Sequence, residues 1–126
     1  YRLDDLVVEH NLSNIDYLKI DVEGHEVALL KGAWSVIEKF LPIVQIELEE
    51  RHGTDVLSVF SDFKKRGFTA YRVHNTKLSI ETPGTFIKAQ RMYEVINRKY
   101  VSDVIFMHQD RADTIPNLSN QIKTRG

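Results

Sequence analysis

The sequence contains no cysteine among its 126 residues. This absence excludes disulfide bonds, thiolate nucleophiles and zinc sites with cysteine ligands, and it fits a reducing compartment. No apolar run approaches the roughly 20 residues that a membrane-spanning helix needs, and no signal peptide opens the chain. We therefore expect a cytoplasmic protein that has no membrane partner.

An excess of charge of either sign is also missing. Seventeen basic and eighteen acidic residues leave a formal net charge of -1, which gives no general attraction to nucleic acid. Hydrophobic residues make up 42% of the chain and charged residues 28%, as in ordinary globular proteins. A chain of this length forms one domain at most. Because it begins at Tyr1, inside a predicted helix, we expect a fragment of a longer protein.

Motifs for nucleotide binding and for a serine nucleophile are absent too. The sequence has neither a GxGxxG nor a GxxxxGK[ST] pattern, and none of its serines lies in a nucleophile elbow. The five histidines are dispersed along the chain. The chemistry that remains is that of carboxylates and single histidines.

The first half of the chain predicts a βαβ unit. Residues 15–22 read as a mostly apolar strand, interrupted by Lys19, which either faces a cleft or extends past its neighbours to solvent. Apolar residues then recur at helical spacing over residues 26–40, and Trp34 is expected in the core. A second, β-branched strand begins at Ile43. Strand, helix and strand within about 30 residues favour parallel strands with a right-handed crossover.

Carboxylates follow both predicted strands. Asp21 and Glu23 end the first strand, and Glu47 and Glu49 end the second. Because parallel strands present their carboxyl ends at one edge of a sheet, we expect these acids to converge where ligands bind. Asp21, Glu23 and Glu47 could hold Mg²⁺, bind a ligand's hydroxyl groups or accept a proton. The residues alone do not choose among these.

Three further polar residues border the predicted crevice. His25 lies at the start of the helix, where it is either a general base or a polar residue of an exposed first turn. Glu26 beside it could serve the site or simply stabilise the helix dipole. His52 follows the second acidic strand end and could approach the same crevice.

The second half predicts a helix capped by Thr54, followed by a strand over residues 68–74. Residues 103–108 read as a last strand, antiparallel to residues 68–74. From residue 109 onward the chain is polar, and we expect residues 109–126 to be a mobile tail.

The first half also resembles a known family, the FkbM-type methyltransferases. The resemblance rests on residues 3–6, 15–26, 30–33 and 42–47. It includes the unusual Lys19 within a strand and the Asp-Val-Glu-Gly sequence that follows, and it covers residues 3–50 well. The resemblance implies a Rossmann-like class I fold and an S-adenosylmethionine-dependent transfer of a methyl group to a hydroxyl oxygen of a sugar or natural product.

In that fold, the glycine-rich loop and the acid that bind the cofactor belong to an upstream half. Residues 1–108 would then be the carboxyl-terminal half of the domain, from its fourth strand to its antiparallel sixth and seventh strands, and cofactor-binding residues within the chain are unknown. By resemblance, Asp21, Glu23 and Glu47 would line the crevice beside the transferred methyl group. One of them, or His25, would accept the proton of the attacking hydroxyl.

Two other classes of function compete with this reading. The same acids could be ligands of a magnesium-dependent phosphoryl-transfer or hydrolase domain. Alternatively, the chain could be a non-catalytic half-domain that pairs with a partner, a second copy or the missing amino-terminal half. The strand at residues 15–22 would then offer an exposed sheet edge.

Overall fold

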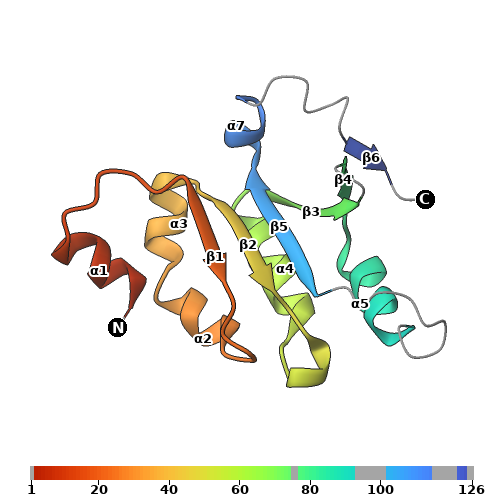
Figure 1. The fold of residues 1–126 in the computed structure, drawn as a ribbon. Coiled ribbons are helices and arrows are strands. Elements are labelled where there is room, and N and C mark those ends of the chain that lie inside the picture. Colours follow the sequence, from red (N-terminus) through yellow and green to blue (C-terminus); the bar gives the residue numbers. More distant parts are fainter. Residues whose placement is uncertain (1, 75–76, 93–101, 115–121, 125–126) are drawn as a thin grey trace.

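The computed structural model of the chain describes residues 2–74, 77–92, 102–114 and 122–124. One six-stranded sheet forms the centre of the molecule (Figure 1). In sheet order its strands are β1 (Tyr17–Ile20), β2 (Ile43–Glu47), β5 (Asp103–His108), β3 (Phe68–His74), β4 (Lys77–Ile80) and β6 (Ile122–Thr124). The helices are α1 (Leu3–Glu9), α2 (Glu26–Lys31), α3 (Trp34–Phe40), the 3₁₀ turn η1 (Glu50–His52), α4 (Val56–Lys65), α5 (Pro83–Arg91) and α7 (Gln109–Ala112).

The strand directions confirm a mixed α/β fold. β1 and β2 pair in parallel, with α2 and α3 connecting them, so the predicted βαβ unit is present. β5 pairs antiparallel with β3, as the sequence predicts, and also antiparallel with β2. β1 pairs only with β2 among the described residues, so one edge of the sheet is open there. None of the helices in the described ranges has the length and apolar character that a membrane span requires.

The prediction of one continuous helix over residues 26–40 is wrong, because the helix breaks into α2 and α3. The backbone N–H of Asp4 donates to the carbonyl of Gly32 (2.9 Å), and Asp4 Oδ1 accepts from the N–H of Val36 (3.0 Å). A side chain on Gly32 would lie 3.1 Å from the side chain of Arg2. The start of α1 therefore sits against the break and satisfies backbone groups that a continuous helix would have paired internally.

The predicted cap of the next helix is also wrong by one residue. Asp55, rather than Thr54, caps α4 by accepting a hydrogen bond from the N–H of Ser58 (3.1 Å). Thr54 is buried and donates its hydroxyl to Glu26 instead (3.1 Å). A tertiary contact thus takes the side chain that local sequence assigned to the cap.

One face of the sheet packs against α2, α3 and α4. Alternate strand residues, including Ile20, Val44, Ile46, Val104 and Phe106, are buried on this face. The ring of Phe63 from α4 stacks on Phe106 at 4.0 Å, and Trp34 packs edge-on against Phe63 at 4.9 Å. Trp34 therefore belongs to the core as predicted, and the Arg66 guanidinium covers its ring at 3.9 Å.

The opposite face of the sheet is less covered. Toward β1 and β2 its residues Tyr17, Lys19, Gln45 and Glu47 are exposed or half-buried. Toward β3, Tyr71 and Met107 are buried in a small cluster against Ile105. The Tyr17 hydroxyl donates to Gln45 Oε1 of the neighbouring strand. Lys19, whose place in a strand was unusual, reaches solvent on this face.

The described part of the tail contains two elements that the sequence did not predict. Arg111 of α7 donates to the carbonyls of Phe40 and Leu41 at the end of α3, both at 3.0 Å. A cation at this position satisfies carbonyls that the helix leaves unpaired. β6 pairs in parallel with β4. The mobility expected of residues 109–126 and the division at residue 108 stay predictions.

Candidate active site

Two acidic strand ends meet at the carboxyl edge of β1 and β2. Asp21 follows β1, Glu47 ends β2, and the β2–β5 register places Asp103 opposite Glu47. Burial raises the pKa of Glu47, and the negative charges of Asp21 and Glu49 and a hydrogen bond with Asp21 raise it further. We call Asp21, Glu47, Glu49 and Asp103 the acidic cluster. The predicted convergence of Asp21 and Glu47 is therefore present.

The contact between Asp21 and Glu47 has a chemical consequence. Ionised carboxylates only accept hydrogen bonds, so a bond between two carboxyl groups requires one of them to be protonated. The raised pKa of Glu47 favours the protonated form of this carboxyl beside Asp21. An arrangement of this kind, at the edge where α/β sheets bind ligands, is suited to acid–base work or to binding hydroxyl groups.

Glu23 is not part of this cluster. It is exposed, in a left-handed backbone conformation (φ 43°), and it is not among the groups that perturb Glu47. Among the described residues, no group of three or more histidine, aspartate or glutamate side chains could hold a metal ion. The ligand set that the magnesium alternative requires, made of Asp21, Glu23 and Glu47, is thus not assembled.

The loop after β1 is fixed by Glu26 rather than by Glu23 or His25. Glu26 is only 2% exposed; its Oε1 accepts from the N–H of Gly24 (3.1 Å), and its Oε2 accepts from the Thr54 hydroxyl (3.1 Å). One buried carboxylate therefore joins the loop after β1 to the loop after β2. His25 is exposed at the start of α2, and its role as a general base stays a prediction.

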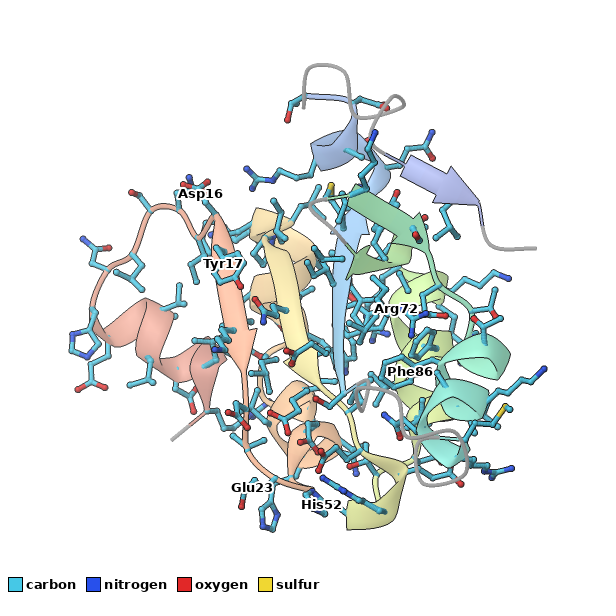
Figure 2. All side chains as sticks on the ribbon, turned by 45° about the vertical axis from the view of Figure 1, so that its right-hand side comes forward. Asp16, Tyr17, Glu23, His52, Arg72 and Phe86 are labelled. Atoms are coloured by element: carbon cyan, nitrogen blue, oxygen red, sulfur yellow. The ribbon has the colours of Figure 1, made fainter. Side chains whose placement is uncertain are left out.

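The same two loops touch through Gly24. Its φ is 93°, and a Cβ on this residue would lie 3.1 Å from the backbone carbonyl oxygen of His52. The left-handed backbone and the close approach both favour glycine. His52 therefore lies beside the loop that carries Glu23, at the same end of the sheet (Figure 2).

A contact between Glu49 and His52 adds a residue pair that the sequence did not single out. His52 Nδ1 lies 2.7 Å from Glu49 Oε2, while Arg51 donates to Glu49 Oε1 at 3.1 Å. The Glu49 side chain is 6% exposed and that of His52 is 39% exposed. Their spacing of three residues across η1 was a usable signal, because residues three apart lie on one side of a 3₁₀ turn.

Helix α5 contacts the chain just after β2. Gln90 donates to the Leu48 carbonyl and accepts from the N–H of Glu50 (3.0 Å), and Arg91 Nε donates to Glu50 Oε1 (3.2 Å). The start of α5 at Thr82 is a capping box. These contacts fix the position of the chain just after β2.

A second buried acid lies away from the cluster. Glu81 at the end of β4 has a fully buried side chain, and Arg72 Nε lies 3.2 Å from its Oε2. Burial raises the pKa of Glu81, against hydrogen bonds from Thr85 and the backbone of Thr82. Figure 2 shows Arg72 near Phe86 of α5, distant from Glu23 and His52. No local sequence pattern pointed to this pair.

Residues 1–70 match the family model described as the methyltransferase FkbM domain. The match spans more than half of the chain, and the chain belongs to this family, as the resemblance over residues 3–50 predicted. It includes both acidic strand ends and the loops that Glu26 joins. The family indicates a methyltransferase. No curated protein and no solved structure gives a significant match.

Proposed function

We propose that this FkbM-domain chain takes part in transferring a methyl group from S-adenosylmethionine to a hydroxyl oxygen of a sugar or natural product. The observation that supports the proposal is the family match over residues 1–70, which contains the acidic cluster residues Asp21, Glu47 and Glu49. These residues lie at the carboxyl ends of parallel strands, where ligands of open α/β sheets bind. A Rossmann-like class I arrangement is part of the proposal; parallel β1 and β2 followed by antiparallel β5 support it.

The acidic cluster fits both reactants. S-adenosylmethionine supplies a methyl group on a positively charged sulfur, and uncompensated carboxylates such as Asp21 and Glu47 favour a cation nearby. A hydroxyl-rich acceptor presents hydrogen-bond donors, which ionised carboxylates accept. Asp21 and Glu47 would orient the acceptor, while the exposed Glu23 and His25 would contact it at the rim.

Partners and location are proposed on the same basis. The acceptor is a small molecule or saccharide, with no nucleic acid or membrane, and the protein acts in the cytoplasm. The open edge of β1 would pair with an upstream half of the domain or with a second copy. A parallel edge strand with a half-buried Leu18 and an exposed Tyr17 supports such an added neighbour.

The test is methyl transfer by the protein that carries this chain. It is incubated with S-adenosylmethionine labelled on the methyl group and with a panel of monosaccharides, oligosaccharides and glycosylated natural products. We expect label in a product that survives mild base, because a methyl ether is stable where a methyl ester is hydrolysed. A label that mild base removes would show that the acceptor group is a carboxyl and not a hydroxyl. The absence of any transfer would favour the non-catalytic half-domain.

A further inference from the structure

We infer that His52, oriented by the buried carboxylate of Glu49, accepts the proton of the acceptor hydroxyl during methyl transfer. The inference deepens the proposed function and rests on it. Three features of the described residues carry it: the contact between Glu49 and His52, the placement of His52 beside the loop after β1, and the exposure of the imidazole.

The contact with Glu49 favours one tautomer of His52. Nδ1 lies 2.7 Å from Glu49 Oε2, and two lone pairs at that distance would repel, so the contact favours a hydrogen on Nδ1. Glu49 Oε2 is buried and has no hydrogen bond of ordinary geometry in the described part of the chain, which leaves this ring nitrogen as its nearest donor. Arg51 donates to the other oxygen. Nδ1 therefore faces Glu49, and Nε2 is left to accept a proton.

The 3₁₀ turn η1 fixes the position of His52 relative to Glu49 and to the loop after β1. Glu49 precedes η1 and His52 ends it, so the carboxylate and the ring lie on the same side of one 3₁₀ turn. Gly53, with φ 79°, ends the turn directly after the histidine. The backbone of His52 touches Gly24, one residue from Glu23 and three from Asp21. His52 thus lies against the loop that leads on from Asp21.

The His52 ring is accessible to an acceptor, whereas the Glu49 carboxylate is shielded. The Glu49 side chain is 6% exposed, whereas the His52 side chain is 39% exposed, so the orienting group is shielded and the proton acceptor is reachable. A buried carboxylate that orients an imidazole through Nδ1 leaves Nε2 as a general base. Glu47, by contrast, has the like charges of Asp21 and Glu49 as neighbours, and burial and these charges raise its pKa. His52 is the better acceptor for a hydroxyl proton.

The reaction step balances with the methyl donor of the proposed function. The acceptor oxygen forms a bond to the methyl carbon, and the carbon–sulfur bond breaks with its electron pair left on sulfur. The hydroxyl proton moves to Nε2 of His52, which becomes an imidazolium ion beside the negative Glu49. The proton then leaves to water, so no oxidant or reductant is needed. Glu49 acts as a positioning residue and His52 as the catalytic residue.

The first experiment reads the tautomer by ¹⁵N NMR of the histidine rings in this chain, without any methyl donor. We expect a protonated Nδ1 and an unprotonated Nε2 on His52. In Glu49→Gln, Arg51 holds the amide oxygen, so the amide nitrogen faces Nδ1 and the tautomer reverses. Glu9→Gln, an exposed acid on α1, is the control and should change nothing. A wild-type His52 with its hydrogen on Nε2 would overturn the inference, whether or not Glu49→Gln folds.

The second experiment separates this inference from the proposed function. In the protein that transfers methyl groups, His52→Gln should lower kcat by about 10²–10⁴-fold, with the KM for S-adenosylmethionine unchanged. His10→Gln, at the exposed residue that follows α1, should keep wild-type turnover. Wild-type turnover in His52→Gln would remove the catalytic role. Absence of transfer in the wild type would instead reject the proposed function, and with it the catalytic role of His52. The tautomer measured by NMR would still show whether Glu49 orients the His52 ring.

Discussion

Two acid-bearing strand ends of this fold differ in how the negative charge is balanced. At the end of β4, Glu81 is fully buried but has the guanidinium of Arg72 at 3.2 Å. At the ends of β1 and β2, Glu47 has acids as its nearest charged neighbours, and its pKa is raised. At the end of β4, the guanidinium offsets the burial of the Glu81 carboxylate. Like charges held together cost stability, and such a cost marks a site of chemistry.

The largest change in stability is expected at Glu81, whose buried charge is balanced by Arg72. Arg72→Met leaves the Glu81 carboxylate buried without its counter-charge, which should lower the free energy of unfolding by about 3–5 kcal/mol. Urea denaturation measures the change. Adding Glu81→Gln to Arg72→Met should recover part of the loss, because the second change removes the orphaned charge. Arg91→Met is the control, since its pair with Glu50 lies at the surface. Equal losses in both arginine variants would contradict the comparison.

The next effect is expected at Glu26, the acid that joins the two site loops. Glu26→Gln can accept only one of the two present hydrogen bonds, so the free energy of unfolding should fall by about 1–3 kcal/mol. Thermal or urea unfolding gives the value. Thr54→Val should reproduce part of the loss and Thr54→Ser should not, because serine keeps the hydroxyl that donates to Glu26. A fully stable Glu26→Gln would mean that the loops are held by other contacts.

Substitution of Glu47 is expected to raise the stability at neutral pH, by a smaller amount. The folded state raises the pKa of Glu47 above the ordinary value of 4.5, so the folded state binds this proton more tightly than the unfolded chain does. Its favourable contribution is complete below the unfolded pKa and is lost as pH rises through the folded pKa. Glu47→Gln should therefore match the wild type near about pH 4 and exceed it at about pH 7, by roughly 0.2–1 kcal/mol after solvent screening.

Unfolding curves at the two pH values provide the measurement for Glu47→Gln. Glu9→Gln, an exposed acid on α1, should show no such crossing. A Glu47→Gln variant that loses stability as pH rises, relative to the wild type, would reverse the sign and contradict the raised pKa of Glu47.

The smallest effect on stability is expected at Asp21. It is exposed, and Asp21→Asn keeps its size, so the free energy of unfolding should change by no more than about 0.5 kcal/mol. Turnover of the methyl-transferring protein should nevertheless fall by about 10²–10⁴-fold, because the variant alters the carboxyl pair with Glu47. Asp5→Asn on α1 serves as the matched control. Equal turnover in Asp21→Asn and wild type would remove Asp21 from the mechanism.

Much of the sheet and part of the site could be predicted because their signals are local. The strand directions follow from chain order and connection length, and these place Asp21 and Glu47 at one edge. The same reasoning placed Glu23 there too. Glu23 does lie at this end of the sheet, but its left-handed backbone leaves the side chain exposed and outside the acidic cluster.

Other features depend on residues far apart in the sequence. The break between α2 and α3 comes from Asp4, whose carboxylate caps Val36 across 32 positions, so helical periodicity could not reveal it. The anchoring of α5 depends on Gln90, 42 positions from Leu48. The contact between Glu49 and His52 could have been predicted, since their spacing suits one 3₁₀ turn, but no turn was predicted over residues 50–52.

The order of the strands has a consequence for how the protein is made. β2 and β3 do not pair with each other; each pairs with β5, which the chain supplies only at residues 103–108. During synthesis, the β1–β2 pair and the β3–β4 pair therefore emerge as separate pieces. They become one sheet only when the last of the long strands arrives between them, a late and non-local step. A nascent chain that stalls before residue 103 would present unpaired strand edges to its neighbours.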